Sequence, residues 1–256
     1  MEQQPLINSI MKFQNSMKLN YSLIARTFPV LITLLPVIIL GGYFSINLNL
    51  PYVLFSSLGV FAALSFLLSQ IGRDFGKKKE PILWKEWGGM PTIQILRHSN
   101  NHLDSLTKKR YHAQLNQFCP VEEFPSLEFE QSFPEKANEV YSTWTRFMIS
   151  NTRDTTKYSL LYKENVNYGF RRNLWGLKPI AISLILVSIL IVGGFNHLEC
   201  GIKNFIEWPI DAKTLLGVLF FMLLVWLMIV NKDWIKRVGF SYAERLFELT
   251  ERIQIS

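Results

Sequence analysis

The stretch "TFPVLITLLPVIILGGYFSINLNLPYVLFSSLGVFAALSFLLSQIG", residues 27–72, decides the fold, because its 46 residues include no Asp, Glu, Lys or Arg. The hydrocarbon core of a bilayer is about 30 Å thick, and a helix crosses it with roughly 20 apolar residues. A run of this length therefore predicts two crossings. Between them "SINLNLPY" (45–52) interrupts the apolar run, and Pro51 can open the second helix.

Two shorter charge-free runs, residues 179–198 and 214–231, are each long enough for one further crossing. No segment shows the alternation of apolar and polar residues that is typical of a half-buried strand. The predicted fold is therefore all-α: a four-helix transmembrane protein of two hairpins, with a helical cytoplasmic domain between spans 2 and 3. The expected spans are residues 27–46, 51–71, 179–195 and 214–230.

Lysines and arginines near the span ends predict the orientation, because short loops rich in them stay in the cytoplasm. Of the 27 basic residues, 17 lie between Arg73 and Lys178, against 12 acidic ones, whereas the loop 196–213 carries two lysines and three acidic residues. We therefore expect a multi-pass protein of the bacterial inner (plasma) membrane, with both termini cytoplasmic. The expected parts are a cytoplasmic amphipathic segment (1–26), hairpin 1 (27–71), the cytoplasmic helical domain (72–178), hairpin 2 (179–231, with the exported loop 196–213) and a cytoplasmic amphipathic helix (232–256).

The same topology accounts for the formal net charge of +7 and for the two cysteines. A basic cytoplasmic face suits anionic lipid headgroups, so the expected partner is the bilayer, and no direct contact with nucleic acid is expected. Cys119 and Cys200 would lie on opposite sides of the membrane and cannot pair within one chain. Cys200 could pair with its copy in a second subunit, which is one indication of a homo-oligomer.

The central domain divides at residues 118–134, where Pro120, Pro125 and Pro134 exclude one continuous helix. A helix is expected before this loop, capped by Asp104 or Ser105, and one or two helices after it. The apolar stripe of the tail 232–256 predicts that its helix packs on the central domain or on another subunit.

Few residues indicate a catalytic, transport or metal-binding role. No expected span contains an ionisable side chain, which argues against an ion-coupled transporter. Ser57, Ser65 and Ser69 share one face of the second span and could line a pore if several copies assembled; the alternative is hydrogen bonds to neighbouring helices or to their own backbone. His98 and His102 have metal-ligand spacing, but the two asparagines between them disfavour the helix it requires. No catalytic, metal or cofactor site is predicted, and an enzyme is the less favoured reading.

Charged, aromatic and glycine residues are dense in two stretches that flank the central domain, on the inner side of spans 2 and 3. Tryptophan, tyrosine and basic residues suit the membrane interface, but the glycine turns and the nearby Asp and Asn residues need another explanation. A structural clamp between the two stretches, including ion pairs of Arg73–Asp74 with Arg153–Asp154, is one reading, and a pocket for an acidic or nucleotide-like ligand is the other. The candidate residues are Arg73, Asp74, Lys77, Trp84, Trp87, Gly88, Gly89, Arg97, His98, Arg110, His112, Arg153, Asp154, Asn165, Tyr168, Arg171 and Arg172.

These stretches, "RDFGKKKEPILWKEWGGMPTIQILRH" (73–98) with "TKKRYH" (107–112), and "TRD" (152–154) with "LYKENVNYGFRRNLWGLK" (161–178), resemble an uncharacterised family of bacterial multi-span membrane proteins. The plan of short spans around a compact cytoplasmic domain is also similar to that of transmembrane effectors in bacterial antiphage defence, of the retron and CBASS types. The resemblance implies an oligomeric effector of a defence or stress system that perturbs the membrane when its cytoplasmic domain is triggered. The alternatives are a membrane-anchored sensor or scaffold for a soluble partner protein, and an interface enzyme acting on a lipid or nucleotide.

Overall fold

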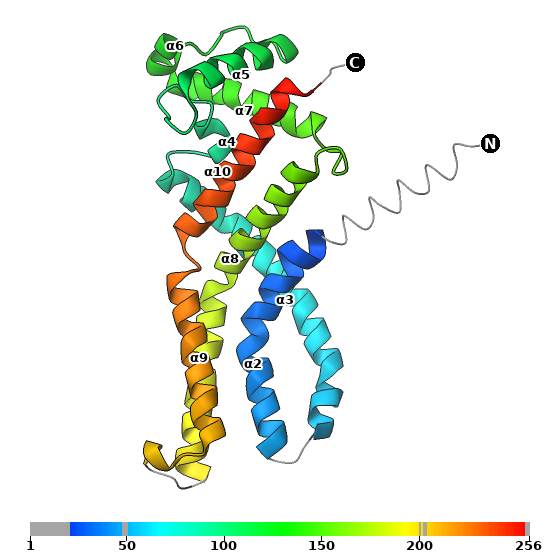
Figure 1. Ribbon diagram of the computed structural model, residues 1–256, viewed down its shortest axis with the longest axis vertical. Coiled ribbons are helices and arrows are strands. Elements are labelled where there is room, and N and C mark those ends of the chain that lie inside the picture. The colour runs from blue at the N-terminus through cyan, green and yellow to red at the C-terminus, as the bar shows by residue number, and fades with distance from the viewer. Residues whose placement is uncertain (1–20, 48–50, 200, 202–203, 254–256) are drawn as a thin grey trace, which may run out of the picture. The chain divides into compact units, whose positions relative to one another are not determined.

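The computed structural model describes residues 21–47, 51–199, 201 and 204–253, with the side chains of all of these except 47, 51–58, 60 and 199. Most of the expected N-terminal segment 1–26 lies outside this set. The described chain is helical throughout and contains no strand, so the all-α prediction is confirmed (Figure 1). The α-helices are α2 (Phe28–Asn47), α3 (Pro51–Glu86), α4 (Pro91–Gln94), α5 (Ser105–Phe118), α6 (Leu127–Ser132), α7 (Pro134–Asn151), α8 (Ser159–Gly194), α9 (Ile210–Met228) and α10 (Lys232–Glu248).

The chain folds as two compact units. One, here called the helical domain, contains the described residues 80–168 and 235–253; the other, here called the bundle, contains residues 21–79 and 169–234. Helices α3, α8 and α10 each contribute residues to both units.

Three helices in the described part of the chain are long and apolar enough to cross a membrane: Leu23–Ile46, Ser159–Leu198 and Ile210–Met228. They match the first, third and fourth expected spans. The second expected span, 51–71, forms the first part of α3 and is not among the three. Several of its side chains fall outside the described set, and α3 continues past it into the charged residues 73–86.

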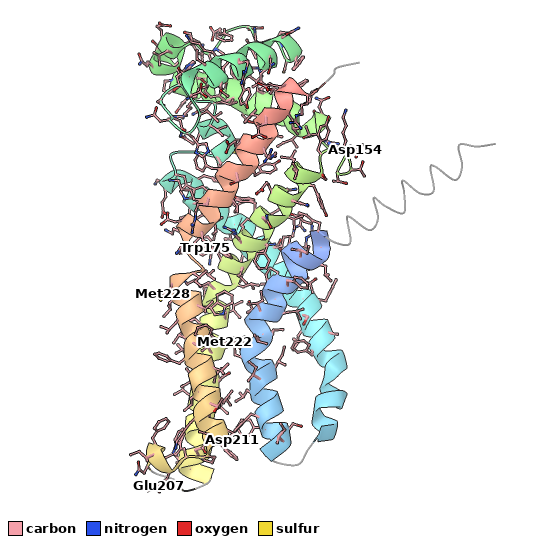
Figure 2. The ribbon with its side chains drawn as sticks, in the orientation of Figure 1. Asp154, Trp175, Glu207, Asp211, Met222 and Met228 are labelled. Carbon is pink, nitrogen blue, oxygen red and sulfur yellow. The ribbon has the colours of Figure 1, made fainter. Side chains whose placement is uncertain are left out.

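Apolar side chains of α8 and α9 form the larger core of the bundle. Ile185, Leu219 and Trp226 are buried in it. The outward faces of these helices are apolar as well: Leu190 of α8 is 73% exposed and Met228 of α9 is 71% exposed (Figure 2). Large exposed apolar surfaces on long apolar helices are typical of contact with lipid, so the bundle is that of a membrane protein.

Glycines bring α3 and α8 into backbone contact. A Cβ atom placed on Gly176 would lie 2.7 Å from the backbone nitrogen of Gly76, and one placed on Gly76 would lie 2.8 Å from Oδ1 of Asn173. Small residues at such crossings let helices approach closely, which is a main source of helix association in a bilayer.

A proline explains the contact between α8 and the start of α2. Pro29 has no backbone N–H, so the carbonyl of Ala25, four residues earlier, lacks its helical partner. The side-chain amide of Asn173, itself buried, donates a hydrogen bond of 2.7 Å to that carbonyl. Arg172 in turn donates to Oδ1 of Asn173 at 3.2 Å. The "FRRN" part of the second stretch therefore serves packing within the bundle.

Helix α8 is longer than its sequence suggests. Pro179 is the expected first residue of span 3, yet it lies inside a helix that begins at Ser159. A proline within a helix removes one hydrogen bond and tends to kink it, and in apolar surroundings neighbouring groups can compensate for this loss.

The helical domain has its own apolar core, built from α4, α5, α7, the start of α8, α10 and the final turn Leu249–Glu251. Trp144 and Met148 of α7 and Leu246 and Phe247 of α10 are fully buried. The C-terminal helix therefore packs on the central segment of its own chain.

Two glycines end α3 and redirect the chain. Gly88 and Gly89 have φ angles of 81° and 143°, which side-chain-bearing residues rarely adopt. Trp87 is buried beside the turn, and the amide of Gln94 donates a hydrogen bond to the carbonyl of Gly88. Pro91 then opens α4, as prolines often do at a first helical position.

Replacing Gly176 by Ala should destabilise the bundle by about 1 to 3 kcal/mol, because the new methyl group meets backbone atoms that cannot move aside. Gly217→Ala in α9 is the matched control, since nothing lies within 4 Å of its Cβ position. Thermal unfolding of the detergent-solubilised chain measures both. Equal midpoints for the two variants would contradict the close crossing.

Candidate functional site

The loop "LRHSN", residues 96–100, is held by buried side chains of α5. His112 donates from Nε2 to the carbonyl of Leu96 at 2.8 Å. Lys108, one turn earlier, donates from Nζ to the carbonyls of Arg97 at 2.7 Å and Asn100 at 2.5 Å. Both side chains are almost inaccessible to solvent. Burial lowers the pKa of the Lys108 ammonium, and two of the three hydrogen-bond donors of that group are directed to loop carbonyls.

Glu130 of α6 holds the other side of this loop. Its buried carboxylate accepts hydrogen bonds from the N–H of His98 at 2.9 Å, the hydroxyl of Ser99 at 3.2 Å and the hydroxyl of Tyr141 at 2.7 Å. Burial alone would raise the pKa of the Glu130 carboxyl, but these hydrogen bonds together bring it below its usual value. Glu130 is therefore ionised at neutral pH and acts as an anchor for the loop backbone.

The side chains of Arg97 and His98 are engaged inside the domain. Arg97 donates to Oδ1 of Asn138 from Nε at 3.1 Å and from Nη2 at 2.7 Å. His98 donates from Nε2 to the carbonyl of Pro125 at 2.8 Å, because a carbonyl can only accept. Both residues join the loop to other parts of the domain.

His112 lies in an aromatic environment. The ring centroids of His98, Tyr141 and Trp144 lie 4.9, 5.5 and 5.4 Å from its own. Its Nδ1 atom is buried and has no hydrogen-bond partner among the described residues. Burial lowers the pKa of His112 to about 4, against the opposing effect of its bond to Leu96, so the ring is neutral at pH 7.

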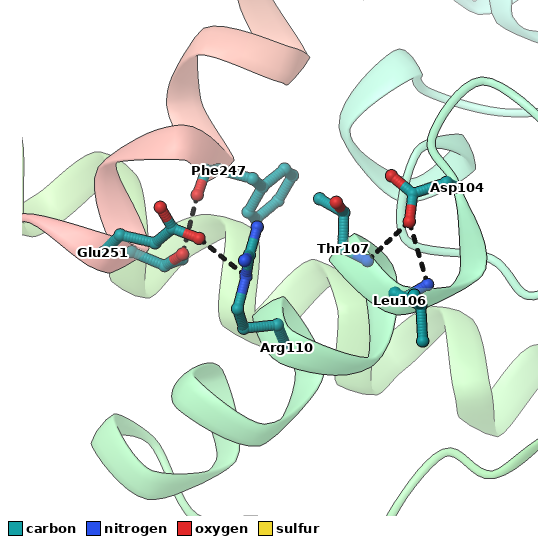
Figure 3. A network of polar contacts seen from close by, with 7 residues as sticks. Asp104, Leu106, Thr107, Arg110, Phe247 and Glu251 are labelled. Carbon is teal, nitrogen blue, oxygen red and sulfur yellow. Dashed lines mark hydrogen bonds and ion pairs between the residues drawn. The ribbon is translucent and has the colours of Figure 1, made fainter.

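Helix α5 is fixed at its N-terminal end and near its middle (Figure 3). Asp104 caps it by accepting from the N–H groups of Leu106 at 3.0 Å and Thr107 at 2.9 Å, which confirms one of the two predicted caps. Nε of Arg110 lies 2.8 Å from Oε1 of Glu251 in the final turn of the domain. Both partners of this ion pair are largely exposed, so its contribution to stability is small.

A cleft of about 170 Å³ opens in the helical domain at the junction of α7 and α8. Two candidate residues of the second stretch, Arg153 and Asn165, line it together with Tyr162 of α8 and Tyr242 of α10. Among the described residues, the side chains of Arg153 and Asn165 form no hydrogen bond or ion pair. Both side chains are therefore available to a ligand in this cleft.

Basic and aromatic residues of the bundle interact at the end of α9. Arg171 donates to the carbonyl of Trp234 at 2.8 Å, and its guanidinium lies 4.6 Å from the centroid of that indole. Lys178 donates to the carbonyl of Val230 at 2.7 Å. The last carbonyls of a helix have no partner within it. Lys178 also donates to one of these, the carbonyl of Leu227 in the last turn of α9, at 3.3 Å. Trp234 lies in the first turn of α10.

The remaining candidates divide between the two units. Arg73, Asp74 and Lys77 belong to the bundle, whereas Arg153 and Asp154 belong to the helical domain, so the ion-pair clamp stays a prediction. Asp154 accepts hydrogen bonds from the turn that follows it, from the N–H groups of Thr156 at 2.9 Å and Lys157 at 3.1 Å.

Two aromatic candidates lie in the helical domain. Tyr168 donates to Oε1 of Glu80 at 2.9 Å. Nε1 of Trp84 is buried without a hydrogen-bond partner among the described residues.

Two of the three serines expected to line a pore are not on an open face of the single chain. Ser65 and Ser69 are buried, and Ser69 donates to the carbonyl of Phe66 in its own helix at 2.7 Å. The side chain of Ser57 lies outside the described set. The pore-lining role stays a prediction about an assembled form.

Sequence reasoning missed Glu130, Tyr141 and Lys108. Lys108 and His112 are four residues apart and share one helix face with the buried Leu115, which is a signal for inward-facing polar groups. Glu130 carries no such signal, because its partners in the loop lie about thirty positions away and meet it only in the folded domain.

Acidification should destabilise the helical domain through His112. The unfolded ring titrates near 6.5 and the folded ring near 4, so the unfolded state binds more protons between these values and the free energy of unfolding falls as pH falls through them. The loss at full protonation is about 3 kcal/mol. Urea unfolding of the full chain in detergent, followed by tryptophan fluorescence from pH 7 to 4, should show this loss, and His112→Gln should reduce it. An identical pH dependence in the variant would contradict the buried neutral ring.

Comparison with known proteins adds no relative to this description. No family model matches the chain, no curated protein matches it, and no solved structure matches it.

Proposed function

We propose that the protein is an oligomeric effector of the bacterial inner membrane, acting in antiphage defence or a stress response. In this proposal four spans cross the membrane, both termini and the helical domain are cytoplasmic, and the bundle perturbs the membrane when the helical domain is triggered. The basic character of residues 73–178 supports the orientation. The resemblance of the two stretches to bacterial multi-span proteins supports the bacterial setting, and the similar architecture of antiphage effectors supports the defence role.

Helix α8 carries the proposal. Its first turns supply Tyr162 and Asn165 to the open cleft, and its later turns form a candidate membrane span. Both stand on one uninterrupted helix, Ser159–Gly194. A ligand in the cleft therefore contacts the same element that enters the membrane.

The engagement of the polar groups around the "LRHSN" loop favours an effector over an interface enzyme. His98 and His112, which that enzyme would use, donate their Nε2 protons to backbone carbonyls, and Glu130 is occupied by loop N–H groups. A general acid or base must reach a substrate proton, and these groups are directed to the protein's own backbone.

Bacteria expressing the protein should lose membrane potential during phage infection, before lysis, as read by a potential-sensitive dye. Trp144→Ala is the informative variant, because it leaves a cavity in the core of the helical domain and destabilises that domain without changing a span. It should abolish the depolarisation while the chain remains in the membrane fraction.

Two outcomes would contradict the effector proposal. One is an unchanged potential in the wild type under every phage tested. The other is co-purification of a stoichiometric soluble partner without depolarisation, which would favour the scaffold instead.

A further inference from the structure

The cleft at the junction of α7 and α8 has one ionisable side chain apart from tyrosine phenols, and that side chain is basic. Arg153 supplies the charge, and Asn165 supplies a neutral amide that can donate hydrogen bonds. Neither side chain has a polar partner among the described residues. A guanidinium with a nearby amide donor suits an oxyanion, because its planar fork of N–H groups matches carboxylate and phosphate oxygens.

Asp154, the carboxylate next to Arg153 in the sequence, forms no ion pair with it in the described part of the chain. Asp154, labelled in Figure 2 between α7 and α8, accepts from the N–H and hydroxyl of Thr156 and from the N–H of Lys157. Lys157 adds a second positive charge to this turn. The local balance of charge therefore favours an anion at the cleft.

The rest of the cleft is aromatic and apolar. Tyr158 just before α8, Tyr162 of α8 and Tyr242 of α10 line it with Leu161 and Ile149. Tyrosine offers a flat apolar ring with a polar tip, so a ligand with a ring or sugar next to its anionic group would contact these side chains. An inorganic anion alone would leave that surface unused.

The volume limits the size of the ligand. A cavity of about 150 Å³ holds one benzene ring, and drug-sized ligands occupy about 300 Å³ or more. At about 170 Å³ the cleft therefore has room for an anionic group with one small ring or part of a sugar. A longer molecule, such as a dinucleotide, would extend out of the open side of the cleft into solvent.

We propose that this cleft binds the phosphate of a small phosphorylated molecule, with Arg153 and Asn165 on the phosphate and the tyrosines against the organic part. The inference deepens the proposed function, since it names the chemistry of the trigger for the helical domain. A soluble phosphate monoester and the monoester headgroup of phosphatidic acid share this chemistry, and the test separates the two sources.

The test uses the full chain in phosphatidylcholine nanodiscs, with phenyl phosphate as the soluble probe and calorimetry as the readout. One molecule should bind per chain, more tightly than inorganic phosphate. Arg153→Ala should weaken binding on the order of 10- to 100-fold, which is the usual effect of losing a hydrogen bond to a charged group. Arg146→Ala is the matched control, because Arg146 is an exposed arginine of α7 that does not line the cleft, and it should change nothing.

A second variant tests the aromatic wall. Tyr162→Ala should weaken the binding of phenyl phosphate and leave the affinity for inorganic phosphate unchanged. Nanodiscs that contain phosphatidic acid form the other arm: if the natural ligand is a lipid phosphate, they should abolish phenyl phosphate binding in the wild type. Circular dichroism should show that every variant remains folded.

Equal effects of Arg153→Ala and Arg146→Ala would overturn the inference, as would an absence of binding by both the soluble and the lipid phosphate. Different results would contradict the proposed effector function. Binding at Arg153 without depolarisation in cells would refute the effector role and keep the ligand site. Depolarisation that Arg153→Ala leaves intact would refute the ligand site as the trigger.

Discussion

The backbone contact between Gly76 and Gly176 is the constraint on which the bundle depends. It leaves no room for a side chain between α3 and α8, and these helices also supply the first and last parts of the central segment in the helical domain. Asn173 adds the second constraint by bonding the carbonyl that Pro29 releases. In apolar surroundings helices associate by close packing and by satisfying backbone groups internally, and the sequence places glycine and asparagine where both are needed.

The stability of the helical domain depends on how its buried charges are hydrogen-bonded. Its core is apolar, yet Lys108 and Glu130 are buried with it, and burying charges is costly unless they are fully hydrogen-bonded. Here both form hydrogen bonds to one short loop, and Tyr141 of α7 also donates to Glu130, so the conformation of the loop is fixed. The cleft at Arg153 remains open to a ligand. A ligand can shift a conformational equilibrium only by its difference in affinity for two states. The effector proposal therefore requires that α8 differ between the ligand-bound and free forms.

The sequence predicts what local patterns determine. Charge-free runs of sufficient length indicate the helices that can cross a membrane, and Asp104 has the position and chemistry of a helix cap. The length of α8 could not be predicted, because Pro179 normally favours a helix start, and its tolerance inside the helix depends on surrounding groups. The hydrogen-bond partners of Arg97 and His98 could not be predicted from the sequence either. Asn138 and Pro125 come close to these side chains only in the folded domain.

The central claim is that the helical domain lies in the cytoplasm while the loop 196–213 lies outside. The two native cysteines test it directly in intact bacteria, using Cys119→Ser and Cys200→Ser to leave one thiol at a time and a membrane-impermeant maleimide as the label. Cys200 should react in intact cells, and Cys119, which is partly exposed in the helical domain, should react only after lysis. Labelling of Cys119 from outside, with Cys200 protected, would contradict the account.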